Sequence, residues 1–244
     1  MILLIIYITY LFFYLDFYSL LYAIPFFFVF YYSIHLIIKK SKKIIHKSKA
    51  LNFHEIKYTI YSIFVFWSIT FIYFKLFELG IINLSFNFWF DWIIMWFIFT
   101  ILHDAYFYFI HAFAHTKIMM KNIHIIHHIS HHTSVLTSYS LHPIEAFLYA
   151  LITLIVFIDN INFYSILIPI FFQDYFTILW HSWYEIQSNK IKNTFIFKYF
   201  MTSTNHSIHH SKNNWNYGLY FLYLDNFFNT ISKDNHKVFD KVTK

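Results

Sequence analysis

The chain has 244 residues, a formal charge of +6 and a mean hydropathy of +0.50, and 59% of its residues are hydrophobic. These values exceed those of soluble globular domains and indicate a membrane protein instead. The absence of cysteine excludes disulfides and thiolate metal ligands. The positive charge comes from lysines beside apolar runs, where contact with anionic lipid is a simpler explanation than nucleic-acid binding.

The first apolar stretch covers residues 1–38 and is interrupted near Asp16 and Pro25. This pattern predicts a hairpin of two membrane segments or one long span. The stretch lacks a basic leader and a small-residue cleavage site, so we interpret it as a retained segment rather than a secretory signal. The basic sequence KKSKKIIHKSK follows, and lysines favour cytoplasmic loops, so residues 39–57 are expected to face the cytoplasm.

Two membrane spans are then predicted at about residues 58–79 and 86–102, joined by the turn LGIINLSFN. An even number of crossings returns the chain to the cytoplasmic side at His103. A further apolar stretch at 144–179 is broken by DNIN at 159–162, which predicts a short hairpin whose arms enter the bilayer only partly.

The more polar segment 185–244 is expected to form a cytoplasmic cap. The predicted fold is an all-α integral membrane protein with about four to six membrane helices and a histidine-rich helical cap on the cytoplasmic side. The expected domains are the N-terminal membrane segments and basic loop at 1–57, a domain at 58–230 that contains the predicted spans and most of the histidines, and a polar tail at 231–244.

Three histidine clusters lie within or next to these elements. In HDAYFYFIHAFAH, the helical period places Asp104, Tyr108, His111 and His115 on one stripe, so His111 and His115 can bind one ion together. In HIIHHISHH, the same period places His124, His127, His128 and His131 on one helix face, with His132 a turn beyond His128.

The third cluster, NHSIHH, repeats this spacing, and another histidine precedes Glu185 in HSWYE. Nine imidazoles are too many for one ion, whereas two ions with four or five nitrogen ligands each would use them all. Imidazole suits Zn, Fe, Cu and Ni, so the number of ligands does not identify the metal. The candidate ligands are His111, His115, His124, His127, His128, His181, His206, His209 and His210.

Other polar residues near these clusters are candidates for orienting a ligand or for additional ligation. This set comprises His103, Asp104, His131, His132, His142, Glu145 and Glu185. Isolated histidines are more often surface or interfacial residues, and His35, His46, His54 and His236 are interpreted in this way.

In their order and spacing these motifs resemble the fatty acid hydroxylase superfamily, particularly its sterol desaturase-like members. The resemblance covers about residues 90–230, from HDAYFYFIHAFAH through IHIIHHIS, SLHPIEAF and HSWYEI to STNHSIHHSKNNWNYGLYFLYLDNFFNT. It implies an integral membrane enzyme in which histidines hold two iron ions. Such enzymes use O2 and two electrons to hydroxylate or desaturate lipid chains, sterols or carotenoids.

The resemblance also assigns the motifs residue by residue. The first histidine motif falls on His111 and His115; the second on His124, His127 and His128; the third on His206, His209 and His210. His181 matches the histidine before the third motif, and His142 matches the His-Pro-x-Glu element. The chain departs from the family pattern at Ala112, where arginine is common, and at Asn229, where glycine is common; His131 and His132 have no counterpart.

The sequence has no cysteine for an iron–sulfur cluster and no glycine-rich dinucleotide motif, so an external electron donor is expected. A b-type cytochrome or a ferredoxin, with its reductase, could dock on a basic rim at Lys121 and Lys212.

The expected location is the cytoplasmic membrane of a bacterium or the endoplasmic reticulum of a eukaryote. The principal alternative is a membrane protein that binds or transports zinc or another divalent ion, and haem ligation is a weaker one. A metalloprotease is disfavoured because HExxH is absent.

Overall fold

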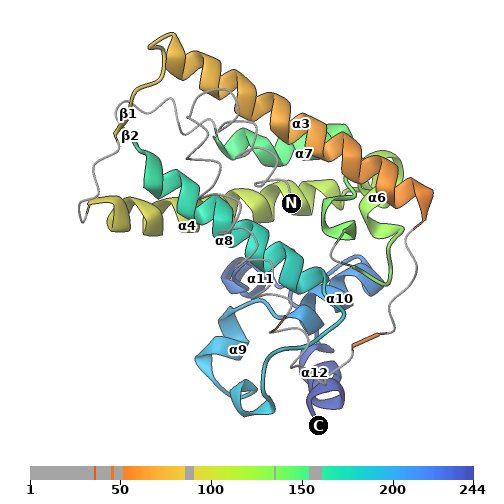
Figure 1. Cartoon of the computed structure of the whole chain (residues 1–244). Coiled ribbons are helices and arrows are strands. Elements are labelled where there is room, and N and C mark those ends of the chain that lie inside the picture. The colour runs from red at the N-terminus through yellow and green to blue at the C-terminus, as the bar shows by residue number, and fades with distance from the viewer. Residues whose placement is uncertain (1–35, 37–44, 47–51, 86–90, 135, 154–160) are drawn as a thin grey trace.

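The computed structural model describes residues 36, 45–46, 52–85, 91–134, 136–153 and 161–244, and these residues are mostly helical (Figure 1). The membrane segments expected within residues 1–38 and most of the basic loop lie outside the described residues. Two described helices are long and apolar enough to cross a membrane: α3 (Phe53–Glu78) and the Ile93–Ala114 part of α4 (Asp91–Ala114). The described part of the chain is therefore mostly helical and contains two candidate membrane spans.

Helix α3 has the distribution of side chains expected of a helix whose solvent is lipid. Its buried residues are polar and lie on one stripe, Glu55, Thr59 and Ser62. Its exposed residues include Ile60 and Phe64, at 58% and 63% exposure. A surface helix of a soluble protein shows the opposite arrangement. The helix begins at Phe53, earlier than expected, because Asn52 and Glu55 form a capping box, so the expected domain boundary at residue 57 falls inside α3.

A turn at residues 79–83 follows α3 (Figure 1). Gly80 has φ +68°, a left-handed conformation that glycine adopts without steric strain. After the turn, β1 (Leu84–Ser85) pairs in parallel with β2 (Ile161–Asn162), directly before α8 (Phe163–His181). This pairing confirms the break expected at DNIN for the two residues of that motif that the structure describes.

Helix α4 extends further than the sequence analysis predicted. The predicted span ended at residue 102, but the helix continues to Ala114 and carries His111. No glycine or proline interrupts this part of the sequence, and the exposed apolar stripe continues through Phe109 and Phe113, at 54% and 50% exposure. His111 therefore lies in the last turn of a candidate span, and His115 follows directly after it.

Short elements follow α4: α5 (Lys117–Met119), a π-helical turn η1 (Met120–His124), α6 (Ile125–His128), a 3-10 turn η2 (Thr137–Tyr139) and α7 (Pro143–Ala150). The single helix face predicted for the second histidine motif is wrong, because α6 ends at His128 and the exposed His131 lies beyond it. The loop after His131 is held by the polar stripe of α3, where Ser62 donates to the Tyr139 carbonyl at 2.6 Å.

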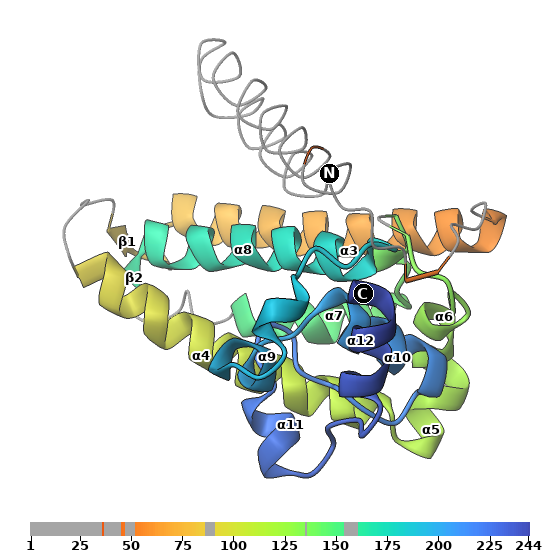
Figure 2. The ribbon, with the colours of Figure 1, turned by 90° about the horizontal axis from the view of Figure 1, so that it is seen from below.

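The remaining chain forms a cap of short helices beside the end of α8 (Figure 2). It contains a 3-10 turn η4 (Asn189–Ile191), α9 (Phe195–Tyr199), α10 (Ser203–Lys212), α11 (Tyr223–Phe227) and α12 (Asn235–Thr243). Leu179, Trp180, Met201 and Leu222 form a buried cluster that joins α8 to the cap. Residues 231–244, expected as a polar tail, pack into the cap through the fully buried Phe239.

Candidate metal centre

The fold brings nine histidine side chains together at the junction between α4, α8 and the cap. They form two groups, and within each group one potential ligand nitrogen per histidine lies within 4.8 Å of all the others. The first group comprises His111, His115, His124, His128 and His209, and the second comprises His127, His181, His206 and His210. These are the nine histidines singled out in the sequence, and the groups contain five and four nitrogen donors.

The two HxxHH motifs each contribute to both groups. In the second motif, His124 and His128 lie in the first group and His127 in the second. In the third motif the allocation is reversed, because His206 and His210 lie in the second group and His209 in the first. Side chains four residues apart stack on one side of a helix, whereas the side chain between them points about a quarter turn away. Each motif therefore spans the boundary between the groups.

The two groups are in direct contact. The ring of His128 lies 4.7 Å from that of His210 and also 4.7 Å from that of His209, measured between ring centroids. The long helices complete the groups: α4 carries His111, with His115 one residue after its end, and α8 ends at His181. Ions held by these two groups would be close neighbours.

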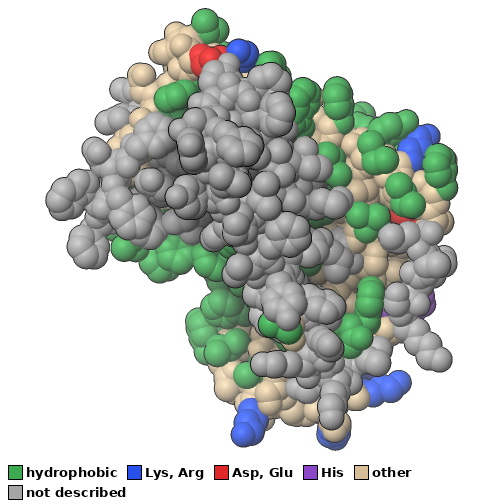
Figure 3. Space-filling model, viewed as in Figure 1, with side chains coloured by type: hydrophobic (Ala, Val, Ile, Leu, Met, Phe, Trp, Pro, Cys, Tyr) green, Lys and Arg blue, Asp and Glu red, His purple; other side chains and the backbone are tan. Residues whose placement is uncertain are grey.

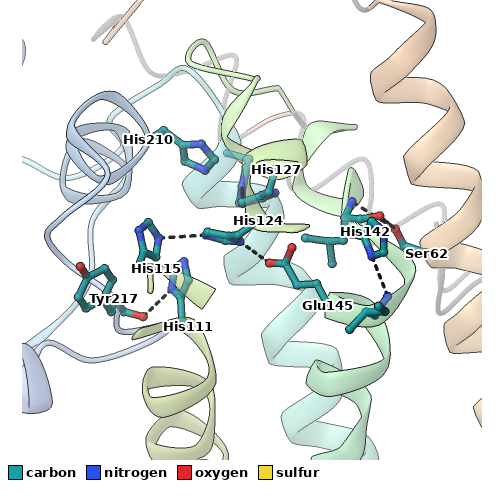
Figure 4. A network of polar contacts seen from close by, with 12 residues as sticks. Ser62, His111, His115, His124, His127, His142, Glu145, His210 and Tyr217 are labelled. Carbon is teal, nitrogen blue, oxygen red and sulfur yellow. Dashed lines mark hydrogen bonds and ion pairs between the residues drawn. The ribbon is translucent and has the colours of Figure 1, made fainter. Parts of the chain in front are cut away.

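Backbone carbonyls fix which nitrogen of two first-group rings faces the centre. His111 Nδ1 donates to the carbonyl of Tyr217 at 2.9 Å (Figure 4), and His209 Nδ1 donates to the carbonyl of Trp215 at 2.8 Å. An N–H at Nδ1 leaves the Nε2 lone pair free. Both Nε2 atoms are buried and have no hydrogen-bond partner. Orphaned lone pairs of this kind are costly unless they bind a cation.

A carboxylate has the same orienting role at His124. Glu145 Oε1 accepts a 2.6 Å hydrogen bond from His124 Nδ1, and both side chains are fully buried. His124 Nε2 then points at His115 Nε2, 3.0 Å away (Figure 4). In the second group, His206 Nε2 lies 3.1 Å from the Nε2 atoms of both His181 and His210. Imidazole nitrogens that converge in this way fit a metal ion as their shared partner.

The histidines outside the spanning segments are neutral in this environment. Burial, and then the neighbouring imidazoles, lower the pKa of His128, His209 and His210 well below the usual value. The same causes lower the pKa of His127 to about 3. Burial raises the pKa of Glu145, while His127 and His111 oppose the rise. Neutral rings with free lone pairs are the form in which histidine binds a metal.

Of the residues expected to orient or supplement the ligands, Glu145 contacts a ring in the centre. Asp104 accepts from the backbone N–H of Tyr220 at 2.8 Å, and Glu185 accepts from that of Thr204 at 3.0 Å, so both carboxylates anchor the cap. The four histidines that were candidates for orienting or additional roles all lie outside the two groups. His103 bonds the Tyr220 hydroxyl, His142 caps α7, His131 bonds the His210 carbonyl, and His132 packs against His46.

The loop that supplies the two orienting carbonyls was not predicted from the sequence. Asp225 holds this loop by accepting from the backbone N–H groups of Tyr217 and Gly218 at 2.8 and 2.9 Å. Any side chain at residue 218 would collide with the Phe221 carbonyl, because a Cβ would lie 2.0 Å from that oxygen. The sequence signal was the Asn-rich run NNWNYG, which indicates a tightly turned loop. Tyr217 also places its ring 4.8 Å from that of His115.

The departure from the family pattern at Asn229 has a conformational explanation. Asn229 adopts φ +57°, in the left-handed region that glycine enters freely and that asparagine tolerates better than other residues. Two further left-handed asparagines, Asn213 and Asn216, lie in the preceding loop, between α10 and α11. The structure offers no explanation for Ala112.

Comparisons with known proteins agree with this site. The family model for fatty acid hydroxylase matches residues 96–230, more than half of the chain and all nine grouped histidines. A Dictyostelium discoideum protein, whose name assigns it provisionally to the methylsterol monooxygenases, is 29% identical over 134 residues. That match covers 54% of this chain and 48% of the relative, so the chain spans about half of the relative's length. No solved structure matches. The family match shows that this chain belongs to the fatty acid hydroxylase family.

Proposed function

We propose that the chain is a membrane-bound diiron oxygenase that hydroxylates or desaturates a lipid with O2 and two electrons from an external carrier. The observation that carries the proposal is the division of nine buried histidines into adjacent groups of five and four. Membership of the fatty acid hydroxylase family supports the reaction class. On this proposal, residues 58–230 form the catalytic domain, and the nine grouped histidines are the metal ligands.

The donor set fits iron, since neutral imidazoles suit Fe(II) and no thiolate is present. Two bound irons would supply, with O2, an oxidant strong enough to break an unactivated C–H bond. Contacts within the chain fix the orientation of three of the ligand rings. The carbonyls of Tyr217 and Trp215 fix two rings, and Glu145 fixes a third. Burial of the surrounding side chains keeps bulk water from the centre.

The proposed substrate is a lipid that enters from the bilayer. The exposed apolar stripe of α4 ends at Phe113, two residues before His115 in the first group. A lipid beside α4 therefore lies close to the centre without crossing water. The name of the Dictyostelium relative makes a sterol one candidate, and fatty acyl chains and carotenoids are the others.

We place the metal centre on the cytoplasmic side of the membrane. Glu55, at the start of α3, accepts a 2.6 Å hydrogen bond from Ser130, which follows the second histidine motif. The beginning of α3 and the histidine end of α4 therefore lie on the same side, as an even number of crossings requires. The lysine-rich segment before α3 favours the cytoplasm for that side. Accessibility tags at residues 45, 120 and 212 should report the same side, and opposite labelling of any pair would contradict this topology.

The electrons are proposed to come from a b-type cytochrome or a ferredoxin with its reductase. Lys121 is exposed close to the second histidine motif, whereas Lys212 pairs with Asp234. The basic rim therefore depends more on Lys121 than the sequence suggested. Turnover with NADH should require the reductase and carrier and should fall as ionic strength rises. Sustained turnover without a carrier would contradict external supply, and turnover independent of salt would contradict docking at this rim.

The reaction itself is tested with 18O2. Membranes of cells that express the chain, supplied with iron and a reductase system, should form an O2-dependent lipid product. Hydroxylation places one 18O atom in the product, whereas desaturation adds a double bond without the label. His127→Ala should abolish the product, and His236→Ala, at an exposed histidine of the cap, should not. No O2-dependent change in any lipid class would overturn the proposed reaction.

A further inference from the structure

The cap carries an exposed apolar surface on α9 and α11, here called the cap patch. Its members are Phe195, Ile196, Phe200, Phe227 and Phe228. Phe195 is 69% exposed and Phe227 is 75% exposed, although both belong to helices of the polar C-terminal region. Scattered exposed apolar residues are normal, but a cluster of large ones marks a contact surface.

The two helices of the cap patch are fixed side by side. Asn226 donates to the Lys198 carbonyl at 3.1 Å, and the backbone N–H of Leu222 donates to the Tyr199 carbonyl at 2.8 Å. The rings of Phe200 and Phe221 lie 5.1 Å apart. These contacts hold the two helices of the cap patch together as one surface, and Figure 3 shows hydrophobic side chains along the left edge of the molecule near α9.

This surface continues onto the candidate span α4. The ring of Phe228 lies 5.6 Å from that of Tyr108 and 5.9 Å from that of Phe109. Phe109 belongs to the exposed apolar stripe that makes α4 a candidate membrane helix, together with Ile98 and Ile101. If lipid surrounds the exposed stripe of α4, lipid therefore also contacts the cap patch.

Charge is distributed as a membrane contact requires. Lys198 is exposed within α9, where its long side chain can extend from an apolar surface to phosphate groups. The polar helices of the cap carry other exposed lysines, which are Lys212 on α10 and Lys237 and Lys241 on α12. The cap is thus apolar on the α9–α11 face, whereas its α10–α12 face carries exposed lysines, of which Lys212 is paired with Asp234. An apolar face beside a lysine-bearing polar face is typical of proteins that lie in the interface of a bilayer.

We infer that the cap patch inserts into the bilayer interface beside α4, so that the cap rests on the membrane by its α9–α11 face instead of projecting into water. The occupant of this surface is lipid. A row of aromatic rings then extends from the lipid-facing cap patch to the metal centre. The ring of Phe228 contacts that of Tyr108, which lies 6.2 Å from the ring of Tyr217. The ring of Tyr217 in turn lies 4.8 Å from that of His115. This inference goes beyond the proposed reaction and does not depend on it.

The absence of cysteine in the chain allows a clean labelling test. The variants Phe227→Cys, Phe195→Cys and Lys237→Cys are each labelled with an NBD fluorophore in the full chain, reconstituted in phosphatidylcholine vesicles. At residues 227 and 195, the emission should shift to the blue and be quenched by phosphatidylcholine spin-labelled near the headgroup. At residue 237, the label should emit as in water and escape quenching. Metal content equal to that of the unmodified chain shows that each variant is folded.

Water-like emission at residue 227 or 195 would overturn the inference. A blue shift without quenching by lipid-borne spin labels would also overturn it, because the patch would then be covered by protein, such as a second copy of the chain. All three positions use exposed side chains, so the substitutions leave the core packing intact.

Discussion

Replacing Glu145 with glutamine should weaken the binding of one metal ion and spare the other. Glu145 accepts a 2.6 Å hydrogen bond from His124 Nδ1, and both side chains are fully buried. Glu145→Gln keeps the shape and removes the charge of the acceptor. A hydrogen bond to a charged group contributes about 1.5–3 kcal/mol. That range corresponds to a loss of roughly 10- to 150-fold in affinity, in line with the effect of removing an outer partner of a ligating histidine.

The loss should be confined to one ion because His124 belongs to the group of five. Titration of the metal-free chain with Co²⁺ against a chelator should give two classes of site, of which Glu145→Gln weakens one. The matched control is Asp174→Asn, which removes a buried carboxylate that accepts from the Tyr139 hydroxyl at 2.7 Å and from no ligand. That variant should bind both ions as before. Equal weakening of both sites by Glu145→Gln, or of neither, would refute the assignment of Glu145.

His127 and His128 are adjacent but belong to different groups. His128→Ala should therefore remove the ion whose binding Glu145→Gln weakens, whereas His127→Ala should remove the other ion. Loss of the same ion in both variants would show that the motif is not divided between the groups. In the folded, metal-free chain the lowered pKa values keep these histidines neutral, whereas in the unfolded chain the same histidines take up protons below about pH 6.5. Its stability should therefore fall from about pH 6.5 downwards, by at most about 1.4 kcal/mol per pH unit for each such histidine, and thermal unfolding between pH 7.5 and 5.5 that shows no such fall would contradict neutral buried rings. Asn229→Gly should leave the melting temperature nearly unchanged, and Asn229→Ala should lower it by the equivalent of about 1 kcal/mol, because alanine is strained at φ +57°; equal melting temperatures for the two variants would contradict this reasoning.

The sequence was sufficient to predict the membrane class, the break at DNIN and the nine histidines that gather in the structure. Spacing alone placed His111 and His115 together, since residues four apart share a helix face. It failed for His131, because the helix ends at His128 and periodicity cannot show where a helix stops. The division of each HxxHH motif also escaped prediction, because it depends on how α6 and α10 face each other across the centre.

The orienting contacts were only partly predictable. Glu145, Asp104 and Glu185 were equal candidates in the sequence, because each lies near a histidine cluster. In the structure Glu145 orients His124, whereas Asp104 and Glu185 accept hydrogen bonds from backbone amides of the cap. The carbonyls of Trp215 and Tyr217 leave no mark in a residue pattern, since every residue carries one. Only the left-handed loop that presents them has a signal in the sequence, namely its asparagines and Gly218.

The diiron centre is tested by the metal content of the chain purified from membranes of iron-supplied cells. Inductively coupled plasma mass spectrometry should find two iron ions per chain, and His127→Ala should reduce the number to one by removing the ion of the four-histidine group. One ion per intact chain, or zinc in both groups, would contradict a diiron centre.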